Sequence, residues 1–167
     1  MVPKGESPGQ GKRNFMRRIL SLVALVVMVG LLAYANPAPP AAAEEVIALT
    51  KAQWAADMKK DVNAAMKNVA DDYTEFNDDY PTRLDGKQIN WKLAEANNAG
   101  SGGVVAAEMA NEKVQVYGDV AILTYNYIGV SKDKDGKTEP SRAKSTRVYV
   151  KKNGQWWLVH ANFAPAR

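Results

Sequence analysis

A two-residue turn near the C-terminal end constrains the fold of this chain more than any other feature. The segment RVYVKKNGQWWLVHANF (147–163) places Asn153-Gly154 between two runs in which apolar and polar residues alternate. An Asn-Gly pair in that setting is the strongest short-range signal of a β-hairpin. A two-residue turn pairs Lys152 with Gln155, and every later pair follows from it, because successive side chains point to opposite faces.

The register that follows from this turn predicts two unlike faces. One face is apolar and carries Val150 opposite Trp157 and Val148 opposite Val159. The other face mixes aromatic and polar groups, and five of its side chains are predicted to line a sheltered, ligand-binding cavity: Arg147, Tyr149, Trp156, His160 and Asn162. Arg147 directly opposite His160 suits a carboxylate or another anion. The alternative is that both groups complete a structural network with Asp71 or Asp72.

Helical spacing precedes strand spacing along the chain. Apolar residues recur at helical intervals over residues 46–60, 62–73 and 87–98, with Thr50 and Asp61 as candidate caps of the first two helices. From residue 104 onward the period is two, and turns at Tyr117-Gly118-Asp119 and Asp135-Gly136 separate the strands. Helices followed by an antiparallel sheet predict an α+β fold.

The N-terminal 43 residues have the layout of a secretory signal. A basic start ending at Arg18 is followed by seventeen uncharged, mainly apolar residues (19–35) and then by a segment of alanine and proline. Cleavage is predicted after Ala35 or Ala43, which gives a periplasmic or secreted protein. The alternative is an uncleaved anchor in the inner membrane, although a span needs about 20 residues. Membrane contact is expected only through this segment.

The charge belongs to the same N-terminal segment. Of the 22 Lys and Arg and the 18 Asp and Glu in the chain, five bases and one acid lie in residues 1–43. Residues 44–167 therefore hold 17 of each and are neutral, which argues against nucleic acid as a partner. With one histidine and no cysteine, thiol chemistry is excluded, and no metal site and no cofactor are predicted. Residues 44–167 suit a single domain.

Several short motifs, taken in order, resemble the nuclear-transport-factor-2-like superfamily. Within it, the pattern is most similar to the SnoaL-like domain and to the association domain of calcium/calmodulin-dependent protein kinase. The motifs are Asp71–Tyr73, Asp85-Gly86 before a helix, Tyr117-Gly118-Asp119, Thr146-Arg147-Val148, and Gly154-x-Trp156 followed by Val159-His160. The resemblance covers about residues 47–165.

The resemblance implies a cone-shaped α+β fold in which three N-terminal helices pack on a curved antiparallel sheet. It also implies a pocket at the open end and homodimerisation through the sheet. Arg147 matches an arginine that lines the pocket in the kinase association domain. His160 matches the first histidine of a His-x-His ending, whose second position is Asn162 in this chain.

Three functions remain open from the sequence. The first is an exported domain that binds a small anionic or aromatic molecule. The second is an isomerase, cyclase or dehydratase of the ketosteroid-isomerase or SnoaL type, with His160, Tyr73, Asp78 and Tyr125 as candidate acid–base groups. The third is a structural homo-oligomerisation domain. The acidic run over residues 71–79 is interpreted as a solvated helix end, and Trp54 and Trp91 as core residues.

Overall fold

The computed structural model describes residues 40–166, and the predicted signal segment up to residue 39 lies outside them. The described helices are α2 (Pro40–Met58), α3 (Val62–Ala65) and α4 (Lys87–Asn98). The described strands are β1 (Val69–Asn77), β2 (Leu84–Asp85), β3 (Gly103–Tyr117), β4 (Val120–Lys132), β5 (Thr138–Lys152) and β6 (Gln155–Pro165). Within this part of the chain, every helix is too short or too polar to cross a membrane.

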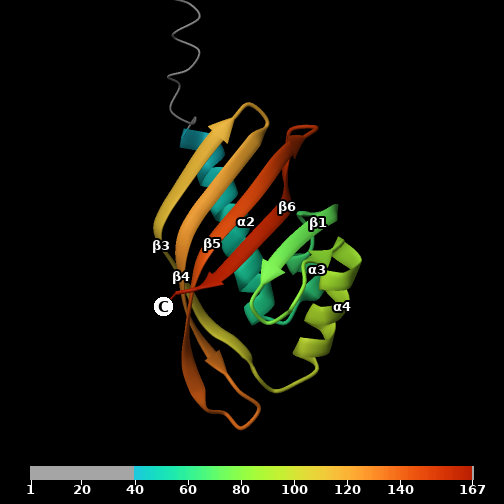
Figure 1. The fold of residues 1–167 in the computed structure, drawn as a ribbon, viewed down its shortest axis with the longest axis vertical. Coiled ribbons are helices and arrows are strands. Elements are labelled where there is room, and N and C mark those ends of the chain that lie inside the picture. Colours follow the sequence, from blue (N-terminus) through green and yellow to red (C-terminus); the bar gives the residue numbers. More distant parts are fainter. Residues whose placement is uncertain (1–39, 167) are drawn as a thin grey trace, which may run out of the picture. The chain divides into compact units, whose positions relative to one another are not determined.

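The six strands form one curved, open sheet in the order β2-β1-β6-β5-β4-β3. Helix α2 lies against one face of this sheet, and α4 lies beside β1 (Figure 1). The predicted α+β fold class is therefore confirmed. The sheet is mixed, because β1 runs parallel to β6 while the other neighbours are antiparallel.

The core lies between α2 and the covered face of the sheet. It contains eleven buried side chains: Val46, Trp54, Val69, Tyr73, Ala121, Leu123, Tyr125, Tyr149, Trp156, Leu158 and Ala161. Buried residues alternate along part of β4 (Ala121, Leu123, Tyr125) and of β5 (Ser145, Arg147, Tyr149), so these strands turn one face inward there. We call this the inner face, and the opposite surface of the sheet the outer face.

The predicted second helix is wrong beyond its first turn. Helix α3 ends at Ala65, and β1 begins at Val69. Asp61 does cap α3, because its side chain accepts a hydrogen bond of 3.0 Å from the amide of Ala64. The segment that follows has apolar residues at both helical and strand intervals. The segment forms a strand because pairing with β6 gives its backbone N–H and C=O groups hydrogen-bond partners. A short, exposed helix leaves the groups at its ends without partners.

Thr50 lies inside α2 and is not its cap. The helix begins ten residues earlier, at Pro40. The Thr50 hydroxyl is fully buried, donates to the carbonyl of Val46 at 3.0 Å, and lies 2.8 Å from the hydroxyl of Tyr149 on β5. A buried hydroxyl needs such partners, so this contact fixes α2 on the sheet.

The hairpin of β5 and β6 has the predicted turn but not the predicted register throughout. Lys152 pairs with Gln155 and Tyr149 with Leu158, as expected. A β-bulge then shifts the pairing, so that Val148 lies opposite His160 and Arg147 opposite Ala161. The predicted pair of Arg147 and His160 is therefore wrong. Arg147 points to the inner face, and His160 lies on the outer face.

The bulge arises where β6 pairs with strands on both sides. Leu158 pairs with Val69 of β1, and its amide donates to the carbonyl of Asn68 at 2.8 Å. The next pair of these two strands is Thr74 with His160, so the register against β1 shifts at the same place. A bulge bends a strand and increases its twist. In β6 it lies where the strand pairs in parallel with β1 on one side and antiparallel with β5 on the other.

Replacing Gly154 by alanine should destabilise the domain by about 1 kcal/mol. Gly154 has φ +80° and Asn153 has φ +52°, which is the left-handed backbone that a two-residue hairpin requires. No atom lies within 4 Å of an added Cβ, so the cost is conformational rather than steric. Urea unfolding measures it. Gly100→Ala is the control, because that site has no left-handed φ and only an ordinary contact; equal losses at both sites would contradict the prediction.

Candidate functional site

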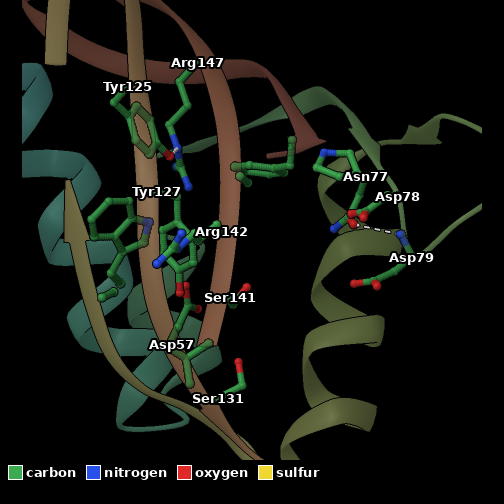
Figure 2. A pocket seen from close by; sticks show the side chains of 16 residues that line it. Asp57, Asn77, Asp78, Asp79, Tyr125, Tyr127, Ser131, Ser141, Arg142 and Arg147 are labelled. Carbon is green, nitrogen blue, oxygen red and sulfur yellow. Dashed lines mark hydrogen bonds between the residues drawn. The ribbon is translucent and has the colours of Figure 1, made fainter. Parts of the chain in front are cut away.

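A cavity of about 470 Å³ opens at one end of the inner face. Its walls come from α2, from the end of β1 and from four strands of the sheet. The lining residues are Trp54, Asp57, Asn77, Asp78, Asp79, Val104, Ala107, Tyr125, Tyr127, Ser131, Ser141, Arg142, Ala143, Arg147, Phe163 and Pro165. Figure 2 shows Arg147 and Tyr125 at one end, with Asn77, Asp78 and Asp79 across from the strands.

Arg147 is the buried cation of this cavity. Its residue is only 5% exposed, because it stands between Leu123 of β4 and Ala161 of β6, both fully buried. Its Nε donates to the hydroxyl of Tyr125 at 2.9 Å, and its Nη1 donates to the side-chain oxygen of Gln53 on α2. Within residues 40–166, no carboxylate lies within 4.0 Å of the guanidinium.

The guanidinium of Arg147 keeps its charge in this setting. Burial alone lowers the pKa of Arg147, but the hydroxyls of Tyr125, Tyr149 and Tyr73 raise it, and the net pKa is above the ordinary value. The guanidinium carbon also lies 5.4 Å from the centre of the Phe163 ring, a cation–π distance. Burying a cation without a carboxylate partner costs free energy. An anion bound in the cavity would supply that partner.

Asp57 is the main titratable acid on the helix side. It stands one helical turn beyond Gln53 and lines the cavity, and its residue is partly open to solvent. Burial raises the pKa of Asp57 to about 6; the charge of Arg147 lowers it and that of Glu75 raises it. Burial also raises the pKa of the nearby Tyr127 hydroxyl.

The wall across from α2 is made by β1 and the turn after it. Glu75 is held there by two side chains of its own strand: Tyr73 donates to it at 2.6 Å and Asn77 at 3.0 Å. Burial, together with the charge of Glu75, raises the pKa of the Tyr73 hydroxyl. Asp78 lines the cavity next to this network. The predicted solvated helix end is thus a strand and a turn.

The structure brings together only some of the predicted ligand residues. Arg147, Tyr149 and Trp156 share the inner face, but of these only Arg147 lines the cavity. The hydroxyl of Tyr149 is hydrogen-bonded to the hydroxyl of Thr50 on α2. The indole of Trp156 donates to Glu45 at 2.9 Å, so both aromatic residues attach α2 to the sheet.

His160 and Asn162 lie on the outer face, away from the cavity. The Nδ1 atom of His160 lies 2.8 Å from the hydroxyl of Thr74 on β1, and the ring meets Phe76 edge-on at 6.1 Å. Asn162 is exposed opposite Thr146. Neither side chain reaches Arg147, because the bulge at residue 159 reverses the facing of the residues that follow it.

The predicted acid–base residues are also separated. Asp78 and Tyr125 both line the cavity, Tyr73 is buried against Glu75, and His160 is on the outer face. Trp54 is buried as predicted and also forms a wall of the cavity, with edge-on contacts to Tyr125 at 5.5 Å and Tyr127 at 5.4 Å.

Sequence reasoning missed most polar residues of this site, including the cavity residues Asp57 and Arg142 and the Arg147 partner Gln53. The four-residue spacing of Gln53 and Asp57 on a predicted helix was the available signal, since it places both on one face. Nothing in the local pattern distinguishes Arg142 from other exposed cations of the sheet. Among the described residues, no cluster of three His, Cys, Asp or Glu side chains is placed to hold a metal ion.

Comparison with known proteins gives one family. Residues 42–166 match the family described as the calcium/calmodulin dependent protein kinase II association domain. No curated protein sequence matches the chain.

Solved structures share the fold at low sequence identity. A putative association domain from Xanthomonas campestris is 21% identical with a TM-score of 0.66, covering 78% of this chain and 94% of its own. The association domain of the Caenorhabditis elegans kinase is 21% identical with a TM-score of 0.63, covering 74% and 95%. A putative dehydratase of the nuclear-transport-factor-2-like family from Streptomyces avermitilis is 17% identical with a TM-score of 0.68, covering 77% and 99%.

The variant Asp57→Asn should be more stable than the wild type at pH 8 and equal to it near pH 4. A carboxyl whose pKa is raised by folding stabilises the folded state below its unfolded value of 3.8, and that contribution is lost as the pH rises through about 6. The whole shift corresponds to about 3 kcal/mol, which screening at this exposed carboxyl reduces to about 1 kcal/mol.

Urea unfolding at the two pH values measures this difference. Asp135→Asn, which removes the same charge from the exposed loop between β4 and β5, is the matched control. A gain in stability that is the same at pH 4 and pH 8 would show that the environment of Asp57 does not penalise its charge.

Proposed function

The chain belongs to the calcium/calmodulin-dependent protein kinase II association-domain family, and from that premise we propose that its cavity binds a small anionic or aromatic molecule. The observation that carries this proposal is Arg147, a buried cation that faces a cavity and has no carboxylate within 4.0 Å among the described residues. A ligand carboxylate would supply the missing partner.

The hydrogen-bonding capacity of Arg147 supports an anionic ligand. A guanidinium has five N–H donors, and Tyr125 and Gln53 accept from two of them. Three donors remain for a ligand, enough for a bidentate carboxylate. Trp54, Tyr127 and Phe163 add aromatic wall around the same space, which suits a ligand with an apolar or aromatic body.

A second candidate is catalysis of proton transfer beside a carbonyl group, as in an isomerase, cyclase or dehydratase. The observation that favours it is Asp57, whose pKa of about 6 suits a general base near neutral pH. Arg147 would stabilise the enolate, and the fold neighbour from Streptomyces avermitilis carries the description of a putative dehydratase. Because one fold hosts many functions, the similarity to that neighbour supports the fold of this chain and not its activity.

We propose in addition that the domain forms a homo-oligomer through the outer face of the sheet. Five half-buried apolar side chains gather there on β4, β5 and β6: Ile122, Val148, Val150, Trp157 and Val159. A second copy packed on this face would complete the burial of these side chains. Solved neighbours that are described as kinase hub domains support self-association as the use of this surface.

Arg147→Met should weaken the binding of a small carboxylate. The wild type is expected to bind benzoate more tightly than benzamide, and the variant is expected to lose at least tenfold in benzoate affinity, because charged hydrogen bonds contribute about 1.5–3 kcal/mol. Isothermal titration calorimetry at a temperature where both proteins are folded measures this.

Two further variants keep that experiment decisive. Arg147→Lys retains the charge and should bind benzoate with intermediate affinity. Arg83→Met removes an exposed arginine paired with Asp85 and should leave binding unchanged. Equal binding of benzoate and benzamide by the wild type, or an Arg147→Met variant that binds benzoate as tightly as the wild type, would contradict the proposal.

Trp157→Asp should convert the oligomer to monomers. A charge within the apolar outer surface would have to be buried without a partner in an assembly through this face. Light scattering coupled to size-exclusion chromatography measures the mass. Val105→Asp is the control, because Val105 is an exposed apolar residue of β3 outside that surface. A monomeric wild type, or a mass unchanged in Trp157→Asp, would exclude this interface.

A further inference from the structure

We propose that the ligand of this cavity is amphoteric, with a carboxylate that pairs with Arg147 and an ammonium group that pairs with Asp57. This inference rests on the proposed binding function and specifies the ligand class. It follows from two opposite charges that line one cavity and do not form an ion pair with each other among the described residues.

The helix α2 sets the spacing of the two charges. Gln53 accepts a hydrogen bond from Arg147, and Asp57 stands four residues further along the same helix. Four residues correspond to about 6 Å along a helix axis. The carboxyl of Asp57 is thus about one turn away from the contact of Arg147 with the helix, and beyond the 4.0 Å of an ion pair. A short chain with charges at both ends fits this gap.

Asp57 has no ion-pair partner of its own among the described residues. The charged and titratable groups around it are Tyr127 of β4, Arg142 and Arg147 of β5, Glu75 of β1, and Asp78 and Asp79 after β1. None of the cations among the described residues forms an ion pair with Asp57. Trp54, one turn before Asp57, lines the same space and offers an aromatic surface that an ammonium group can contact.

A plain carboxylate would satisfy only half of this arrangement. Bound to Arg147, it would place a second negative charge about one helical turn from Asp57, and the repulsion would offset part of its attraction to the guanidinium. An ammonium group at the other end removes that repulsion and replaces it by an ion pair. The cavity should therefore prefer the amphoteric molecule over its unsubstituted counterpart.

Calorimetry with the full chain at pH 7.5 tests this preference directly. The probes are ω-amino acids from glycine to 6-aminohexanoate, each compared with the unsubstituted carboxylate and with the amine of the same length. At least one amino acid should bind ten or more times as tightly as its carboxylate, and the amine alone should bind more weakly than either. Amino acids and carboxylates of equal affinity at every length would overturn the inference.

Charge-removing variants test the role of Asp57. Asp57→Asn should lose the preference for the amino acid while its affinity for the plain carboxylate stays equal or rises. Asp135→Asn, which removes a remote loop charge, should keep the preference. If the preference survives in Asp57→Asn, or is lost instead in Asp78→Asn, the assignment to Asp57 is wrong.

The pH dependence provides a readout that damage to the fold would not imitate. Between pH 5 and 7.5 the carboxyl of Asp57, whose pKa is about 6, loses its proton. Binding of the amino acid should strengthen over this range, because an anionic Asp57 attracts the ammonium group. Binding of the carboxylate should weaken, because the same charge repels it. Parallel slopes for the two ligands would contradict the inference.

The two proposals fail in different ways. If carboxylates bind through Arg147 without any preference for an amino group, the binding function stands and the amphoteric ligand is excluded. If no probe of either kind binds to the wild type, both are overturned.

Discussion

The buried charge of Arg147 is the interaction on which the site depends. Its guanidinium lies between the covered face of the sheet and α2, and its two hydrogen bonds join Tyr125 of β4 to Gln53 of the helix. Both partners are neutral, so the charge is solvated by polar groups but not neutralised within the described residues. The guanidinium is therefore held in a fixed position while its charge has no anionic partner. A site that is ordered in advance in this way loses less entropy when an anion binds.

A single extra residue in β6 decides which side chains can join that site. The bulge at Val159 leaves Arg147 and Tyr149 inside the sheet and sends His160 outside, to Thr74 of β1. The imidazole then borders the surface through which we propose that copies associate. Of the acids that line the cavity, Asp57 comes from α2, whereas Arg147 comes from the sheet.

Local patterns predicted much of the fold but less of the site. Helix α4 coincides with the predicted segment 87–98, and the turns at Gly118, Gly136 and Asn153-Gly154 are all present, because a helical period or a left-handed glycine is a local property. The β1 segment was misassigned as helix because its apolar spacing suits both structures and only pairing with β6 distinguishes them. The site was partly predicted: Arg147, Tyr125 and Asp78 line the cavity, whereas Asp57, whose only local signal was its helical spacing from Gln53, was missed.

The amino-acid sequence by itself determined the alternation that buries Arg147 and Tyr149 on one face, the hairpin turn that starts the register, and the cap at Asp61. These depend on a few neighbouring residues, and short-range sterics and hydrogen bonds are enough to specify them. Only the tertiary structure decided the place of the bulge, the parallel pairing of β1 with β6, and the presence of Asp57 and Arg147 in the lining of one cavity. Each of these depends on contacts between segments far apart in the chain, where curvature of the sheet and the seating of α2 outweigh local preference.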